Sequence, residues 1–344
     1  MAQYAFRGVD QSPSLQELVL HRALVRSMSI GDTGVMIHIQ SLIDDAKCFE
    51  TVRALRWPNG VYCPRCDSFE ITKQGSDDTQ PERQRYLCQS CERRFDDLTD
   101  TIFAGHHQPL RVWILCLYFM GLNLSNHQIA QELDLNKDDV HQMTSQLRQG
   151  IVRKKPSPTL TDEVECDEVY IVAGHKGKPN EVVKKGRHGR RRRLKGNRGR
   201  GTLATEKPPI FGMIQRGGEV VIRMLKDVQQ VTIKPLIQAI IAPGTCIYTD
   251  EYSIYSRLEP WGYAHESVCH SRGEYARDND GNGFHEVHVN TMEGFWSLLR
   301  SWLRPHRGIS QDNLPLYLGF FEFVHNVRRR GKALLGTLLE LLLT

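Results

Sequence analysis

Val164-Glu165-Cys166-Asp167-Glu168-Val169-Tyr170 begins a strand-like run that continues to Ala173 and carries acidic residues among apolar ones. A charged side chain inside an apolar strand is costly to bury unless it is paired or binds a metal ion. By the alternation of a strand, Glu165 shares the face of Asp167, whereas Glu168 points to the other face. The alternative is an edge strand whose acids are solvated. Asp167 is therefore the first candidate for a functional carboxylate.

Two further acids occupy positions from which they could meet Asp167. Asp250 ends a short apolar strand, and Glu293 lies in the first turn of an amphipathic helix predicted for residues 290–303. Carboxylates that converge from two strand ends and a helix start can hold Mg²⁺, and two such ions can clamp the attacking and leaving oxygens of a phosphodiester. Each acid also has a structural interpretation. Asp250 could cap the following helix, and Asn290 with Glu293 fits a capping box.

The helix predicted to carry Glu293 places two further side chains on the same face. Trp296 and Arg300 follow Glu293 at i+3 and i+7, so a guanidinium would lie two turns beyond the carboxylate. Such an arginine can bind a DNA phosphate beside a metal ligand. His288 directly precedes the helix and could reach the same place. We therefore expect Arg300 and His288 near the reacting strand.

The order of the expected elements indicates the fold class. Lys154-Lys155-Pro156-Ser157-Pro158 is typical of a linker, and the strand pattern begins after it. The elements expected there are a strand over residues 164–173, a hairpin of strands 209–215 and 219–225, a helix over 232–241, a strand over 246–250, a short helix over 253–258, a strand over 265–269, and helices over 290–303 and 313–328. This order predicts an α/β catalytic domain of the ribonuclease-H-like type.

A zinc site is predicted upstream of these strands. Cys63-Pro64-Arg65-Cys66 and Cys88-Gln89-Ser90-Cys91 form two Cys-x-x-Cys knuckles separated by twenty-one residues. Such a pair is typical of one tetrahedral Cys₄ site for a structural Zn²⁺ ion, the alternatives being buried thiols or a redox pair. The polar segment between the knuckles could not supply a core, so metal binding would provide the folding free energy. A zinc ribbon of this kind can bind DNA, bind protein or only stabilise the fold.

Residues 109–151 carry the pattern of three helices. Ser125 can cap the second helix, and Leu135-Asn136 makes the turn into the third. This spacing is typical of a helix-turn-helix whose third helix enters a major groove, but any small helical bundle shows the same pattern. Asp138 and Asp139 near the start of the third helix would repel phosphates. The residues expected to face outward and contact DNA are Lys137, His141, Gln142 and Arg148.

The positive charge of the chain is local. Its formal net charge of +5 comes from 45 Lys and Arg against 40 Asp and Glu. Residues 184–200 contain ten Lys or Arg and no acid, so the other 35 basic residues are outnumbered by the 40 acidic ones. Such a block either binds a phosphate polyanion, releasing its counterions, or is a solvated loop that touches nothing specific. The residues expected to contact DNA are Lys184, Lys185, Arg190, Arg191, Arg192 and Arg193.

A chain of 344 residues with 40% hydrophobic residues is long enough for two or three domains. No apolar run reaches the roughly 18 residues that span a bilayer, and residues 1–30 lack the order of a signal peptide. We expect a cytosolic location and cysteines that are thiols or metal ligands. The predicted organisation is an unassigned extension (1–40), a helix with the zinc ribbon (41–105), the helix-turn-helix-like segment (106–155), the catalytic domain (160–330) with a basic insertion (184–207), and a helical tail (331–344).

Four stretches together resemble a known family. They are Leu55-Arg56-Trp57-Pro58-Asn59-Gly60-Val61-Tyr62-Cys63-Pro64-Arg65-Cys66, Val164-Glu165-Cys166-Asp167-Glu168-Val169-Tyr170, Ile247-Tyr248-Thr249-Asp250 and His288-Val289-Asn290-Thr291-Met292-Glu293-Gly294-Phe295-Trp296-Ser297. In this order they resemble bacterial insertion-sequence DDE transposases that carry a zinc ribbon and are related to the eukaryotic Merlin elements. The likeness covers residues 41–328, and the start of the chain lies outside it.

The resemblance implies an activity and site residues. Asp167, Asp250 and Glu293 correspond to the DDE triad, and Arg300 to the basic residue after the last acid. Some relatives have Asn as the third member, so Asn290 could share or replace the role of Glu293. The implied reaction cuts element ends and joins them to double-stranded target DNA with two Mg²⁺ or Mn²⁺ ions. A homodimer or larger assembly on DNA is expected, in the bacterial cytoplasm at the nucleoid or in a eukaryotic nucleus.

Two other functions fit the same residues. One is a DNA-binding regulator derived from a transposase, which would use the zinc ribbon and the helices but perform no catalysis. The other is a stand-alone ribonuclease-H-like nuclease, which would cut junctions or hybrids without terminal repeats and without joining products. Mg²⁺-dependent cutting separates the regulator from both enzymes, and joining separates the two enzymes.

Overall fold

The fold is taken from a computed structural model of the chain. Residues 44–184, 186, 199–279, 281–283, 285–306, 308–331 and 333–343 are described. The extension predicted for residues 1–40 lies outside this part of the chain, and so do five of the predicted DNA contacts, Lys185, Arg190, Arg191, Arg192 and Arg193. Within the described residues, no helix is both long and apolar enough to cross a membrane.

The first described segment is a helix followed by a three-stranded ribbon. The helix α2 (Asp45–Arg56) is capped by Asp44, whose Oδ1 accepts two backbone N–H hydrogen bonds. An antiparallel sheet follows, with strands β1 (Ile71–Ser76), β2 (Gln84–Cys88) and β3 (Arg94–Asp96). Trp57, Tyr86 and Phe95 form most of its small apolar core. A segment with so little core depends on further cross-links such as a metal site.

Four helices, together with one side of α9 (Leu314–Arg329), share a second core with α2. They are α3 (Leu110–Gly121), α4 (Asn126–Glu132), α5 (Lys137–Lys154) and α10 (Leu334–Leu343). Ser125 caps α4 as predicted, through a capping box with Gln128. The C-terminal helix α10 packs on α2, α3 and α5, with Leu338 and Leu342 fully buried. The Leu-rich end of the chain is therefore an integral part of this core.

Arg148 on α5 does not face outward, so its predicted exposure is wrong. The residue is 2% exposed, and its guanidinium lies 4.0 Å from the centroid of the Tyr317 ring. Tyr317 belongs to α9 (Leu314–Arg329), which packs along α5. Helical spacing within one segment cannot reveal such a contact, because the covering helix comes 166 residues later in the chain. The other residues proposed on α5 are exposed, namely Lys137, His141 and Gln142.

The central sheet has five strands in the order β6-β5-β4-β7-β8. These strands are β4 (Glu163–Tyr170), β5 (Pro209–Gln215), β6 (Val220–Met224), β7 (Cys246–Thr249) and β8 (Ala264–Ser267). The first three are antiparallel neighbours, whereas β7 runs parallel to β4, and β8 runs parallel to β7. This is the topology of a ribonuclease-H-like domain, which confirms the predicted fold class.

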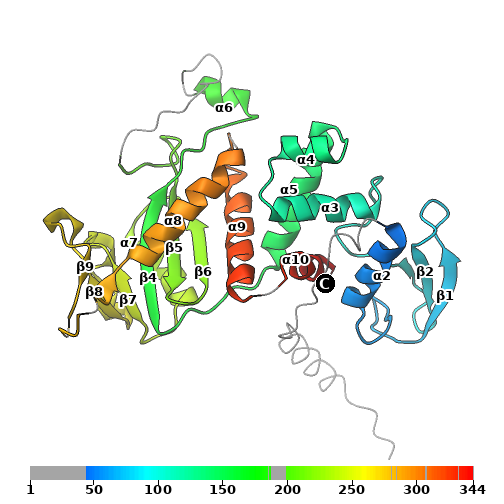
Figure 1. The fold of residues 1–344 in the computed structure, drawn as a ribbon, viewed down its shortest axis with the longest axis horizontal. Coiled ribbons are helices and arrows are strands. Elements are labelled where there is room, and N and C mark those ends of the chain that lie inside the picture. Colours follow the sequence, from blue (N-terminus) through cyan, green and yellow to red (C-terminus); the bar gives the residue numbers. More distant parts are fainter. Residues whose placement is uncertain are drawn as a thin grey trace, which may run out of the picture. The chain divides into compact units, whose positions relative to one another are not determined.

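Helices cover both faces of the sheet (Figure 1). On one face, α7 (Gln230–Ile240) packs Ile233 against a core that includes Cys166 of β4. On the other face, α8 (Asn290–Leu303) crosses β4 and β5, while α9 lies along β6. Val169 of β4 joins this second core, so the alternation along β4 matches the two layers. The short elements are α6 (Pro179–Lys184), before β5, and the paired strands β9 (Ala276–Arg277) and β10 (Val287–His288), before α8.

Two polar side chains of α9 form hydrogen bonds with backbone groups along the edge of β6. Asn326 accepts a 3.0 Å hydrogen bond from the Val220 N–H and donates a 2.9 Å bond to the Val220 carbonyl. Glu322 accepts a 3.0 Å bond from the Ile222 N–H. Glu322 is 1% exposed, and its charge is paired with Lys155. A strand edge covered in this way is protected from pairing with another chain.

Candidate active site

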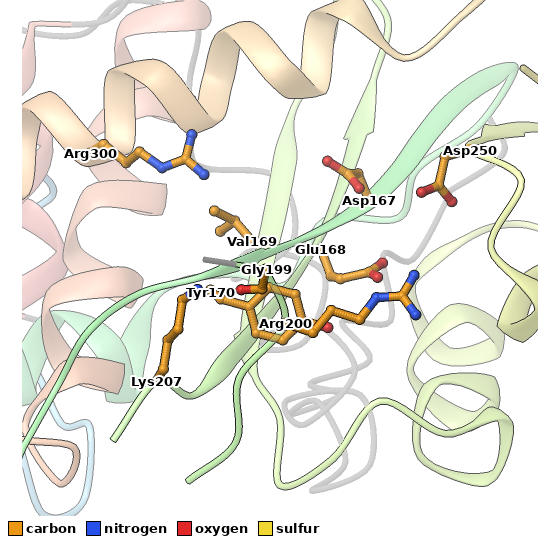
Figure 2. A pocket seen from close by; sticks show the side chains of 9 residues that line it. All are labelled: Asp167, Glu168, Val169, Tyr170, Gly199, Arg200, Lys207, Asp250 and Arg300. Atoms are coloured by element: carbon orange, nitrogen blue, oxygen red, sulfur yellow. Dashed lines mark hydrogen bonds between the residues drawn. The ribbon is translucent and has the colours of Figure 1, made fainter. Parts of the chain in front are cut away.

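Asp167 and Asp250 lie at corresponding positions on the neighbouring parallel strands β4 and β7. The ladder pairs Glu165 with Tyr248, so Asp167 comes beside Asp250 two residues further along each strand. Both carboxylates line one pocket at this edge of the sheet (Figure 2). The carboxyl ends of parallel strands are where ligands of α/β sheets gather. The structure thus brings the first two acids of the proposed triad together.

The pocket has a volume of about 390 Å³ and combines three acidic with three basic side chains. Its lining residues are Asp167, Glu168, Val169, Tyr170, Gly199, Arg200, Lys207, Asp250 and Arg300. Glu168 accepts a 2.9 Å hydrogen bond from the Tyr255 hydroxyl. The guanidinium of Arg200 lies 3.4 Å from the centroid of the Tyr252 ring and extends toward the acids (Figure 2). A pocket of this composition can accept both a cation and a polyanion.

Glu293 approaches the pair of aspartates from α8. It is an exposed residue of the first helical turn, and its charge raises the pKa of Asp167. It does not line the pocket itself. The capping box that offered a structural role is not formed, because Val289 occupies the N-cap and Asn290 is already helical. The Glu293 side chain can therefore contact a bound ion without breaking a helix cap.

A tryptophan of α8 holds the Asp167 carboxylate. The Nε1–H of Trp296 donates a 2.9 Å hydrogen bond to Asp167 Oδ2, and the indole is buried between α8 and the sheet. One Asp167 oxygen is thereby fixed in direction. Asp250 is oriented similarly, since its Oδ1 accepts a 2.9 Å bond from the Tyr252 N–H. This turn contact is the structural role that Asp250 fulfils, and it leaves Oδ2 for another partner.

The acids of the pocket have raised pKa values because negative charge is unfavourable there. Burial raises the pKa of Asp167 to about 6, and the charges of Asp250 and Glu293 contribute. Burial and the Asp167 charge raise the pKa of Glu168 to about 7. The pKa of Asp250 is also raised, mainly by burial. A bound cation would relieve this repulsion, and carboxylate oxygens are the ligands that Mg²⁺ prefers. The donor set fits a hard divalent cation.

The three triad carboxylates do not form one compact cluster. In the part of the chain that the structure describes, only the cysteine quartet brings three or more potential ligand atoms within 4.8 Å of one another. At least one pair among Asp167, Asp250 and Glu293 is therefore wider.

The four cysteines meet in the ribbon. Cys63 Sγ lies 3.6 Å from Cys91 Sγ, and Cys66 Sγ lies 3.5 Å from Cys88 Sγ. All four sulfurs are within 4.8 Å of one another. Zinc–sulfur bonds of about 2.3 Å in a tetrahedron separate sulfurs by about 3.8 Å. The geometry and the donor atoms match a structural zinc site, as predicted.

His288 and Asn290 lie beside the pocket rather than in it. The Nδ1 of His288, expected at the reacting strand, is instead 3.2 Å from Glu165 Oε1 and 3.3 Å from an Arg216 nitrogen. Asn290 is exposed at the start of α8, and its backbone N–H donates a 3.3 Å bond to His288 Nδ1. The sequence pattern correctly places His288 close to the acids. It does not reveal the contact with Arg216, because Arg216 follows a strand that is distant in the sequence.

Several pocket residues carry little or no signal in the sequence. Strand alternation assigns Glu168 to the face opposite Asp167, but β4 ends inside the pocket and both faces reach it. Arg200 is the last residue of the basic run. The sequence indicated DNA contact for this run as a whole and not for Arg200 in particular. Tyr170 and Lys207 have no distinguishing pattern. Lys184, at the end of α6, is exposed and paired with Glu181 at 2.7 Å.

Known proteins are similar to this chain over both the ribbon and the sheet. Residues 159–326 match an ISXO2-like transposase domain, and residues 43–94 match a transposase zinc-ribbon domain. A protein in transposable element ISH50 of Halobacterium salinarum is 36% identical over 309 residues, which are 89% of this chain and 99% of that protein. A transposase-like protein of Haemophilus influenzae is 25% identical over 103 residues, which are 30% of this chain and 77% of that protein. The ISXO2-like domain match contains Asp167, Asp250 and Glu293, and the zinc-ribbon match contains the four cysteines.

Proposed function

The chain belongs to the family of ISXO2-like transposases, and from this we propose that it cuts the ends of an insertion element and joins them to target DNA. The reaction is a metal-dependent phosphodiester transfer without a covalent protein–DNA bond. The proposal is supported most by the pocket in which Asp167 and Asp250 meet, with Glu293 close enough to raise the pKa of Asp167. Buried acids that repel one another are typical of a functional site rather than of a binding surface.

Each carboxylate has its own role in this proposal. Asp167 and Asp250 would hold one Mg²⁺ or Mn²⁺ ion, and Asp167 with Glu293 would hold a second. When bound, the ions supply charge stabilisation at the attacking and leaving oxygens. Trp296 would hold the Asp167 carboxylate in one orientation through its bond to Oδ2. Asn290, one turn before Glu293, is the alternative third ligand.

Basic residues around the acids bind the DNA backbone. Arg200, Lys207 and Arg300 line the pocket, so phosphates next to the reacting one meet fixed positive charges. Contacts of this kind position DNA without reading its sequence. The zinc ribbon and the exposed side chains of α5 recognise the element ends. Two ends take part in one reaction, so the active form is a homodimer or larger assembly on DNA.

Cleavage and joining of labelled DNA that carries the element ends, in Mg²⁺, tests this function. Wild-type protein is expected to nick and join these ends. Asp167→Ala is expected to bind them with unchanged affinity and to lose cleavage by about 100-fold or more. Glu259→Ala, which removes an exposed acid of the same domain, serves as the control. Cleavage by Asp167→Ala at the wild-type rate would overturn the proposal, and cutting without joining would indicate a nuclease.

A further inference from the structure

Glu165 is a buried carboxylate to which the proposed chemistry gives no role. It lies two residues before Asp167 on the same face of β4, and it is 0% exposed. A buried charge is costly unless partners compensate it fully. The partners of Glu165 therefore indicate why an ionised group is placed there.

Three hydrogen-bond donors from other elements converge on Glu165, and the ring of His288 lies beside them. Arg216 donates its Nε–H to Oε1 at 2.8 Å, and Thr291 donates its hydroxyl to the same oxygen at 2.9 Å. The backbone N–H of Met292 donates to Oε2 at 2.9 Å. His288 Nδ1 lies 3.2 Å from Oε1. Thr291 and Met292 are in the first turn of α8, so Glu165 caps this helix from outside.

The helix capped in this way carries Glu293. Its own N-cap residue, Val289, provides no side-chain capping bond, so Glu165 supplies the acceptor for the N–H groups of the first turn. The Trp296 bond to Asp167 fastens the same helix to the same strand about one turn further on. Strand β4 and helix α8 are thus joined through Met292 and Trp296, which lie on either side of Glu293 in the helix.

Arg216 connects this cluster to the remaining acid. Its guanidinium lies 3.9 Å from the centroid of the Tyr248 ring, and its NH2 donates a 2.9 Å bond to the His288 carbonyl. The Arg216 side chain is 15% exposed, so these contacts are largely shielded from water. Tyr248 lies two residues before Asp250 on β7. The cluster therefore touches all three elements that present the proposed metal ligands.

We propose that Glu165 is a positioning residue that sets the separation of Asp167 and Glu293 by capping α8, and thereby sets the affinity of the site for its divalent ions. Glu165 itself contacts neither the ions nor the DNA. The proposal rests on the function proposed above. Groups that orient the ligands of a metal typically change its affinity by about 10- to 100-fold when removed.

Mn²⁺ binding by the full chain, measured by electron paramagnetic resonance, tests this role. Glu165→Ala is expected to raise the Mn²⁺ dissociation constant roughly 10- to 100-fold. Glu165→Gln keeps one acceptor oxygen and is expected to have a smaller effect, and Thr291→Val a smaller one still. Hydrogen exchange at the Met292 amide should accelerate most in Glu165→Ala, because only there does the amide lose its acceptor side chain entirely.

Glu322→Gln is the matched control. Glu322 is an equally buried carboxylate that accepts a strand N–H and pairs with Lys155 and Arg223, on the β6 side of the sheet. Glu322→Gln is expected to lower the melting temperature without changing the Mn²⁺ dissociation constant. The proposal is overturned if folded Glu165 and Thr291 variants bind Mn²⁺ as the wild type does, or if Glu322→Gln weakens binding equally. If Asp167→Ala itself retains Mn²⁺ binding and cleavage, the function proposed above fails instead.

Discussion

Gly212 lies directly opposite Asp167 in the antiparallel ladder between β4 and β5. A Cβ atom on Gly212 would come within 2.6 Å of Trp296 Cζ2, on the same indole that donates to Asp167. The missing side chain at position 212 is therefore what lets α8 approach the sheet closely enough to reach the carboxylate. The absence of a side chain at Gly212 thus determines how close to the sheet the helix that carries Glu293 can lie.

Gly212→Ala should displace Trp296 and weaken the seating of α8. Overpacking of this kind costs about 1 to 3 kcal/mol, so urea denaturation should show a decrease of that size in the free energy of unfolding. Gly294→Ala, on the exposed side of α8 with no atom within 4 Å of the added Cβ, is the control. It should gain up to about 1 kcal/mol from helix propensity. Equal stabilities for the two variants would contradict the packing described here.

Arg148→Met should leave DNA affinity unchanged. The Arg148 side chain is buried, and its Nε has no hydrogen-bond partner among the described residues. Replacing it with an apolar side chain of similar length is expected to keep the free energy of unfolding the same or raise it by about 1 kcal/mol. Lys137→Ala, on the exposed start of the same helix, should instead weaken binding and reduce the salt slope by about 1.

A mobility-shift titration of the two variants at several salt concentrations checks this contrast. If Arg148→Met loses DNA affinity as Lys137→Ala does, the covering of α5 by α9 does not persist on DNA. If neither variant loses affinity, α5 is not the helix that contacts DNA.

Cys88→Ser should abolish stoichiometric zinc binding and unfold the ribbon. The remaining three sulfurs cannot complete a tetrahedral site, and the apolar core around Trp57 is too small to hold β1–β3 alone. Metal analysis and hydrogen exchange of residues 57–97 provide the readouts. Cys269→Ser removes a partly exposed cysteine outside the quartet and should change neither. Slow exchange in a zinc-free ribbon would show that the metal is dispensable.

Acidification should destabilise the helical core through His306. Burial and the charge of Arg148 lower the pKa of His306 from 6.5 to about 4. Between these values the unfolded chain binds a proton that the folded chain does not, so stability is full above pH 6.5 and falls as the pH drops toward 4. The loss is roughly 3 kcal/mol. His306→Gln should show a shallower fall in unfolding free energy, whereas the exposed His107→Gln should match the wild type.

The sequence predicts those features that local pattern determines. Strand alternation around Asp167, the turn at Gly217-Gly218 and the two Cys-x-x-Cys knuckles each lie within a short segment. Their spacing alone defines a strand, a hairpin and a zinc ribbon. The order of these elements then leaves few topologies, and the observed strand order is the one expected for a ribonuclease-H-like domain.

The remaining features depend on contacts between distant segments. Nothing near Arg148 indicates that α9 will cover it, and nothing near Glu165 indicates that it will cap α8. Lys207, which lies just before β5, lines the pocket, and no local pattern indicates that it does. The capping box that the local pattern at Asn290 predicted does not form, and the Met292 N–H binds the buried carboxylate of Glu165 instead.

A crystal structure of the chain with element-end DNA and Mn²⁺, recorded with anomalous scattering, would locate the divalent ions at the end of β4. If Asp167, Asp250 and Glu293 together hold these ions, we expect two anomalous peaks that share Asp167, with Asp250 contacting one and Glu293 the other. An anomalous map without a peak at Asp167, or with Glu293 turned away from every peak, would show that these carboxylates are not the ligands.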